Sequence, residues 1–233
     1  MSKKTKPKME YRYYDIPAGS PILALLGEKW NQNYGKGIDC LHFHNYLEIG
    51  YCYNGEGVLT IRETDYPFQG GMFSIIPKNV PHTTNSLEDT YSQWEYLFID
   101  SDRFLTETFA KNVIQQKELI KRIDSSSYFF HCEEMPRAAG LIRQIMDTMR
   151  ERREFFMEET KGLLFALLIE IARISNSVEK KTFCSNGNFK GGGRNNYSQC
   201  SGFYQYKLLQ AAACGRDCRR MSHQRNALST VIF

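Results

Sequence analysis

The pattern of apolar and polar residues changes near residue 101 of this 233-residue chain. Before that point, short apolar runs are separated by glycine and proline, and they cover residues 46–54, 58–61, 72–76 and 94–99. Closely spaced runs with apolar residues on both faces are typical of a β-barrel or jelly roll. The first two runs flank "NGEG" and predict a hairpin. The first hundred residues therefore predict a small all-β barrel.

In the last of these runs, alternate side chains differ in kind. Trp94, Tyr96 and Phe98 fall on one face of an extended strand, and Leu97 and Ile99 fall on the other. Both faces are therefore expected to be buried, each against a different layer.

After residue 101 the apolar spacing becomes helical. Residues 102–123 are expected to be partly helical, and two amphipathic helices follow within 137–177. The short charged connection "RERREFF" favours an antiparallel pair. Such a pair either covers the sheet of the barrel or pairs across a two-fold axis into a homodimer. The apolar stripe that we assign to dimerisation consists of Leu141, Ile145, Met149, Leu164, Leu167, Leu168 and Ile171.

These patterns predict an α+β chain in five parts. The parts are a disordered basic N-terminus (1–9), a barrel with a following helical segment (10–123), a connector (124–136), the helix pair (137–177) and an irregular basic tail (178–233).

Charge and cysteine content narrow the function classes. The tail holds nine Lys/Arg and two Asp/Glu, for a net +7, whereas the preceding 177 residues have a net −3 and no general basic surface for phosphates. Seven cysteines without paired spacing fit a reduced compartment. Without a secretory signal or a long apolar run, we expect a cytoplasmic protein with no membrane partner.

The candidate chemistry lies in the stretch "CLHFHNYLEIG", which begins at residue 40. On an extended strand, His42, His44, Tyr46 and Glu48 would share one face. His82 follows about 35 residues later, after a turn bounded by prolines. Two or three imidazoles and one carboxylate inside a barrel would suit Fe(II), Mn(II), Ni(II) or Zn(II) and leave positions open for other ligands.

Both stretches resemble the two cupin motifs. In the first, G-x5-H-x-H-x3,4-E-x6-G, the matching residues are Gly37, His42, His44, Glu48 and Gly55, with one residue fewer before the first histidine. In the second, G-x5-P-x-G-x2-H-x3-N, they are Gly71, Pro77 and His82, with Asn79 in place of glycine and Asn85 one position early. The resemblance implies a double-stranded β-helix with His42, His44, Glu48 and His82 at the metal positions of enzymatic cupins.

A narrower resemblance covers more of the chain. Aromatic-rich strands followed by two amphipathic helices are similar to the sensing half of AraC/XylS-type transcription regulators. That resemblance implies an effector-binding barrel, a dimerising helix pair and a C-terminal DNA-binding half. The residues expected to bind the small-molecule effector, with a sugar as one candidate, are His42, His44, Tyr46, Glu48, His82, Trp94 and Tyr96. No catalytic residue and no resident cofactor are expected, and a divalent metal at the four cupin positions is the alternative.

The tail departs from this family because no helix-turn-helix pattern is present in it. The codons for "EKK" at 179–181 must be rich in A, and reading the downstream message one nucleotide later permits synonymous codons that convert residues 216–233 into "EIAAACRISETHFRRLFS". That string resembles the first helix-turn-helix of the family. We therefore expect a frameshift and the loss of sequence-specific DNA binding in this chain.

Two other interpretations of the tail stay open. A zinc site would use Cys200, Cys214, Cys218 and His223, although the spacing lacks a C-x2-C pair. A disordered basic arm would bind nucleic acid without sequence preference. For the whole chain, the alternative to sensing is a stand-alone metal-dependent cupin enzyme, such as a dioxygenase or an isomerase.

Overall fold

The computed structural model describes residues 8–33, 40–109 and 112–185, and side chains within 9–31, 40–109 and 112–175. The strands are β1 (Lys8–Tyr11), β2 (Ile22–Leu25), β3 (Asn31–Asn33), β4 (Cys40–Phe43), β5 (Leu47–Asn54), β6 (Glu56–Ile61), β7 (Thr64–Gln69), β8 (Met72–Ile76), β9 (His82–Ser86), β10 (Tyr91–Ile99) and β11 (Tyr128–His131). The helices are the 3-10 turn η1 (Glu28–Trp30), α1 (Ser101–Thr108), α2 (Val113–Ile123), α3 (Pro136–Glu151) and α4 (Phe156–Ser185).

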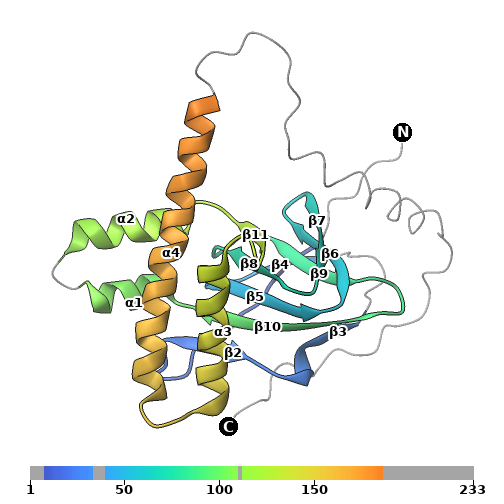
Figure 1. Ribbon diagram of the computed structural model, residues 1–233, viewed down its shortest axis with the longest axis horizontal. Helices are drawn as coiled ribbons and strands as arrows, with labels where there is room; N and C mark the ends of the chain where they lie inside the picture. The colour runs from blue at the N-terminus through green and yellow to red at the C-terminus, as the bar shows by residue number, and fades with distance from the viewer. Residues whose placement is uncertain (1–7, 34–39, 110–111, 186–233) are drawn as a thin grey trace. The chain divides into compact units, whose positions relative to one another are not determined.

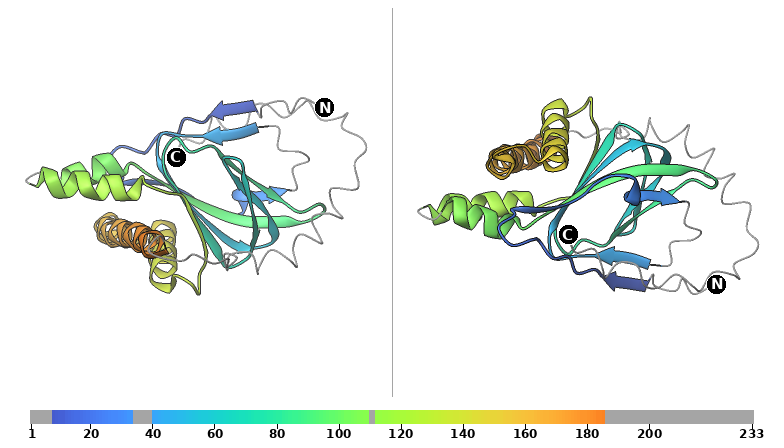
Figure 2. Two further views of the ribbon diagram at one scale, coloured as in Figure 1. Left: turned by 90° about the horizontal axis from the view of Figure 1, so that it is seen from above. Right: turned by 90° about the horizontal axis from the view of Figure 1, so that it is seen from below.

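The strands form two sheets that face each other, as in a cupin barrel. One sheet has the order β1-β4-β9-β6-β7, and the other has the order β11-β8-β5-β10-β2, with β3 also paired to β10. The hairpin predicted across "NGEG" is wrong, because β5 and β6 belong to different sheets and β6 pairs with β7 and β9 instead. The predicted barrel followed by helices is confirmed. Figure 1 shows α3 and α4 beside the second sheet, and Figure 2 shows the helices gathered on one side of the barrel.

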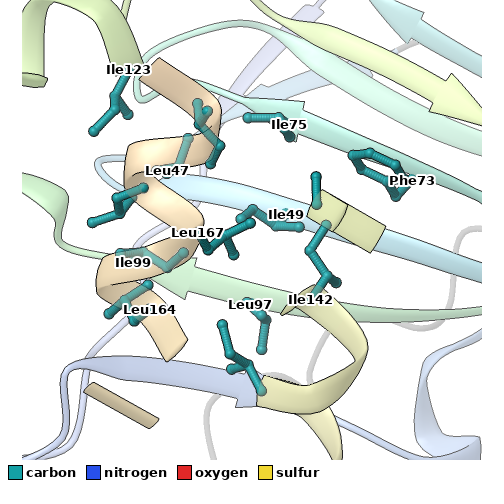
Figure 3. Close-up of a cluster of buried hydrophobic side chains, with 14 of the residues drawn as sticks. Leu47, Ile49, Phe73, Ile75, Leu97, Ile99, Ile123, Ile142, Leu164 and Leu167 are labelled. Carbon is teal, nitrogen blue, oxygen red and sulfur yellow. The ribbon is translucent and has the colours of Figure 1, made fainter. Parts of the chain in front are cut away.

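The second sheet separates two cores because successive side chains of a strand point to opposite faces. Ile49 of β5 lies opposite Ile75 and Leu97, and these three pack with the helices in the larger core (Figure 3). On the other face of the same strands, Cys52 and Trp94 belong to a smaller core inside the barrel. The two-faced pattern predicted for 94–99 is therefore confirmed, and the layer beyond Leu97 and Ile99 is the helix pair.

The apolar stripe assigned to dimerisation lies mainly in the core of the chain, and not on an exposed surface that a second subunit could cover. Its five most regular members are fully buried within one chain and pack on the second sheet, namely Ile145, Leu164, Leu167, Leu168 and Ile171. Leu141 and Met149 are partly buried against the same core. We therefore correct the dimerisation role of the five to a core role. The sequence shows that a helix face is apolar, but a sheet and a second subunit satisfy that pattern equally well.

Three boundaries also differ from those expected. Lys8 and Met9 form the start of β1 rather than a disordered end, because β4 supplies a parallel hydrogen-bonding partner. The expected connector 124–136 contains β11, which pairs with β8. The backbone of α4 continues to Ser185, past the expected start of the tail at 178, and residues 186–233 lie outside the described part. Along the described residues, every helix is too short or too polar to traverse a lipid bilayer.

A buried carboxylate fastens α3 to the second sheet. Glu95 of β10 accepts hydrogen bonds from the Gly27 backbone N–H (2.8 Å) and the Tyr53 hydroxyl (2.7 Å). The Arg150 guanidinium donates to the same carboxylate at 2.6 Å. Because a buried charge is costly unless it is paired, these three donors fix the N-terminal segment, the sheet and the end of α3 together.

The core role of α4 can be tested with one truncation. Leu167→Ala is expected to lower the free energy of unfolding by about 2–5 kcal/mol, because it leaves a cavity beneath the helix. Ile114→Ala on α2 is the matched control, since Ile114 is 85% exposed and its loss should change stability by less than about 0.5 kcal/mol. Urea unfolding of both variants measures the difference. Equal, small losses would contradict the position of α4 described above.

Candidate functional site

Four polar side chains meet between the two sheets. The metal-binding atoms of His42, His44, Glu48 and His82 all lie within 4.8 Å of one another, and all four residues are buried. His42 of β4 lies directly opposite His82 of β9 in one sheet, whereas Glu48 comes from β5 of the other. The structure therefore brings together all four residues that the sequence assigned to a metal.

The route by which these residues meet differs from the prediction. They do not lie along one strand, because β4 ends at Phe43 and β5 begins at Leu47. His44 is in the bend between the two strands, where side chains no longer alternate. Tyr46 contributes its backbone carbonyl, which accepts a hydrogen bond from His44 Nδ1 at 2.9 Å. The ligand-binding role expected for the Tyr46 side chain stays a prediction.

Hydrogen bonds to backbone carbonyls determine which ring nitrogens carry protons. His44 Nδ1 faces the Tyr46 carbonyl, and His82 Nδ1 faces the Val80 carbonyl at 2.9 Å. Since a carbonyl oxygen only accepts, both Nδ1 atoms donate, and the neutral rings keep their lone pairs on Nε2. Those two Nε2 atoms lie 3.0 and 3.2 Å from the two oxygens of Glu48. Lone pairs of nitrogen and oxygen therefore converge on one point, which calls for a positive charge.

The pKa shifts of the cluster residues are those expected for a buried negative charge that needs a positive charge beside it. Burial alone would raise the pKa of Glu48, but the facing His82 and His44 rings outweigh it and hold that pKa well below its usual range. Burial opposes the charged form of His82, and Glu48 outweighs burial and raises the pKa of His82. Burial and the neighbouring His82 lower the pKa of His42 to about 2, so its ring is neutral. The site thus holds a buried carboxylate and at least one imidazole that stays unprotonated.

Several buried polar atoms have no hydrogen-bond partner among the described residues. They include His42 Nδ1, His82 Nε2, which faces Glu48 only as an ion pair, and the indole Nε1 of Trp94. Trp94 is fully buried in the inner core and stacks on Tyr96 with ring centroids 6.0 Å apart. Burial and the nearby Glu48 raise the pKa of Tyr96 well above its usual value. Both aromatic residues predicted to contact a ligand therefore line the interior of the barrel.

Two further residues lie close to the cluster, and no sequence motif indicates them. Tyr14 stacks on Phe98 with ring centroids 3.9 Å apart and meets His44 edge-on at 5.8 Å. Arg12 is close enough to oppose protonation of His42 and His82. Both follow β1 on the chain, and the β1–β4 pairing aligns Glu10 with His42, which brings this segment to the mouth of the barrel. No motif in "YRYYD" indicates this position.

A separate pocket of about 580 Å³ lies outside the barrel. It is formed by the segment before β2, by α1 and by α4, and it is lined by residues that include Ile16, Pro21, Phe104 and Phe165. None of the seven residues predicted to bind an effector lines it. The cluster and this pocket are therefore distinct features of the fold.

Comparisons with solved structures give distant likenesses. The chain is 13% identical to ToxT from Vibrio cholerae strain SCE256, solved with an unsaturated fatty acid bound, over 88% of this chain and 68% of ToxT, with a TM-score of 0.43. It is 10% identical to the AraC-like transcriptional activator CuxR, over 73% of this chain and 54% of CuxR (TM-score 0.36). A cupin 2 conserved barrel domain protein from Salinispora arenicola CNS-205 is 21% identical over 40% of this chain and 79% of that protein (TM-score 0.31).

No curated protein sequence matches this chain. A family model does match it: the AraC-like ligand binding domain, over residues 39–168, a span that includes the whole cluster and most of the helices. Because that span is more than half of the 233 residues, the chain belongs to the family of AraC-like ligand-binding domains.

Proposed function

We propose that this chain senses a small polar metabolite at the buried cluster of His42, His44, Glu48 and His82, as the effector-binding part of an AraC-type regulator. The convergence of three imidazoles and one carboxylate between the two sheets is the observation that supports this proposal most directly. Such a cluster is costly to bury for structural purposes alone, because a packed apolar core would stabilise the barrel at least as well.

We further propose that a divalent transition-metal ion completes the site. Two donor atoms that each lie about 2.1 Å from an ion, at right angles to each other, are about 3.0 Å apart. The Nε2–oxygen separations of 3.0 and 3.2 Å fit that spacing. The backbone carbonyls that hold the Nδ1–H groups of His44 and His82 are typical partners behind metal-binding histidines. When bound, the ion would supply open positions for oxygen atoms of the effector.

The surroundings favour a polar ligand with hydroxyl or carboxylate groups, and a sugar is one candidate class. The unpaired indole N–H of Trp94 is a donor inside the barrel, and Arg12 adds a cation at the mouth. Tyr14 packs against His44, so a ligand bound beside His44 would contact or displace it. Binding would therefore change the packing of the N-terminal segment, and it would favour whichever arrangement of the regulator binds the ligand more tightly.

Two partner predictions from the sequence stay predictions. A homodimer would have to use surfaces other than the five buried residues of the stripe, and the partly exposed Leu141 and Met149 on α3 remain available for it. The expected loss of sequence-specific DNA binding and the zinc alternative both fall in 178–233, of which residues 186–233 lie outside the described part.

The alternative function is catalysis by the same cluster. A stand-alone cupin dioxygenase or isomerase would use the same four residues to hold its metal. We favour sensing because the family model is that of a ligand-binding domain. The two functions differ in one measurable respect, since a sensor releases its ligand unchanged and an enzyme releases a product.

The metal can be tested with Co²⁺ as a spectroscopic probe. Glu48→Gln is expected to weaken Co²⁺ binding by at least about tenfold, because it replaces the only anionic ligand of the cluster with a neutral group of the same shape. His131→Gln is the control, since His131 lies on β11 outside the cluster. Absorption titration of the full chain measures both affinities. Equal binding by both variants, or no binding by the unchanged protein, would rule out the metal at this site.

The effector can be sought by equilibrium dialysis. The purified full chain is dialysed against the small-molecule fraction of a cell extract, and retained compounds are identified by mass spectrometry. We expect a polar metabolite to be retained by the protein and by Ile114→Ala, and to be lost in His82→Asn, which removes a cluster ligand. Recovery of the compound with unchanged mass supports sensing, whereas conversion supports the enzyme. An identical set of compounds on His82→Asn would contradict a barrel site.

A further inference from the structure

We propose that Lys78 transmits occupation of the cluster to α2 and α4, through polar contacts joined by the backbone of the turn and of the end of α2. This inference rests on the proposed function, because it names the route by which the same site would act on the helices. Lys78 is a positioning residue in this proposal and does not touch the ligand. The chain of contacts begins in the turn between β8 and β9, at 77–81.

The turn is attached directly to the cluster. The Asn79 backbone N–H donates to the carbonyl of His44 at 2.8 Å, and Asn79 has a positive φ of 62°. The Val80 carbonyl accepts from His82 Nδ1 at 2.9 Å. The turn thus holds the ring of His82 and the backbone of His44. A displacement of the His82 ring by a bound ion or ligand would act on the turn through the Val80 carbonyl.

Lys78 extends from the same turn toward the helices. Its ammonium group forms an ion pair with Asp102 at the start of α1 and a second one with Asp124, at 3.1 Å, at the end of α2. The second carboxylate oxygens, Asp102 Oδ1 and Asp124 Oδ1, are buried and lack a hydrogen-bond partner within the described part of the chain. Two carboxylates from different helices therefore share one cation, and their mutual repulsion is offset by it alone at this point.

The last step leads to α4. Ser125, next to Asp124, shares a hydrogen bond of 2.8 Å between its Oγ and the Oγ of Ser175. Ser175 is buried on α4, and α2 packs against α4. Polar contacts and two short backbone segments, 78–80 and 124–125, thus connect His82 through Lys78 to Ser175. They lead from the inner face of the barrel to α4, which is the last described helix.

The shared cation makes this connection sensitive to small movements. Burial raises the pKa of Asp124, and the Lys78 ammonium opposes that shift. If the turn carries Lys78 away from one carboxylate, that helix end loses this ion pair, and its preferred position changes. Coupling of this kind requires two arrangements that the ligand distinguishes, and the turn between β8 and β9 supplies the element that differs.

The test is hydrogen exchange of the full chain, measured by mass spectrometry with and without Co²⁺. In the unchanged protein, Co²⁺ is expected to alter exchange in 77–82 and, by about fivefold, in 113–125 and the Ser175 region of α4. In Lys78→Met, Co²⁺ should still bind and still alter 77–82, while the response of α2 and α4 is lost. Lys121→Met, an exposed lysine of α2, should behave as the unchanged protein.

A second variant keeps the test decisive if Lys78→Met does not fold. Ser175→Ala removes only the last contact, so the response of α2 should remain and that of α4 should fall. Retention of the full α4 response in either variant would overturn the proposal. If Co²⁺ binds the unchanged protein but leaves α2 and α4 unaffected, the relay is wrong and the proposed function stands. If Co²⁺ does not bind at all, the metal site and the relay both fail.

Discussion

The buried carboxylate of Glu48 sets the constraint on which this domain depends. It stands between the Nε2 atoms of His44 and His82, whose Nδ1–H groups are already committed to backbone carbonyls. A carboxylate held far from water and faced by nitrogen lone pairs needs a cation, either protons or a metal ion. The backbone of the barrel maintains this need for a cation, because the bend before β5 orients the His44 ring and the turn before β9 orients the His82 ring.

The second sheet links this polar site to the helices. Glu48 and Ile49 are adjacent on β5, yet one faces the cluster and the other faces α3 and α4. Any displacement of β5 at the cluster therefore reaches the larger core without an intermediate layer. The Glu95 network holds α3 to the sheet, and Lys78 holds α1 and α2 to the turn before β9. A sensing role follows from this layout, since one sheet is shared by the site and by the elements that would report on it.

Much of this fold is present in the sequence as periodicity. Alternation over 94–99 and helical spacing over 137–177 predicted the two faces of β10 and the helix pair, because burial imposes those periods directly. The H-x-H pattern, the glutamate four residues after it and the later histidine identified all four cluster residues. Their meeting could not be derived from alternation, since the chain leaves the extended conformation at 44–46, between β4 and β5. No sequence pattern indicates Arg12, Tyr14 and Lys78, because their roles come from contacts with residues that are distant from them along the chain. The apolar stripe on α3 and α4 was misassigned because an apolar helix face can pack either on a sheet of the same chain or on a second subunit.

The cation at the centre of the cluster is most directly tested by X-ray absorption at the cobalt edge of the Co²⁺-loaded chain. We expect a first shell of nitrogen and oxygen atoms at about 2.1 Å, with the outer-shell scattering typical of imidazole rings, and the loss of that scattering in His82→Asn. A shell of oxygen atoms alone, without imidazole, would place the ion elsewhere. In that case the three histidines and Glu48 would form a structural polar core rather than a binding site.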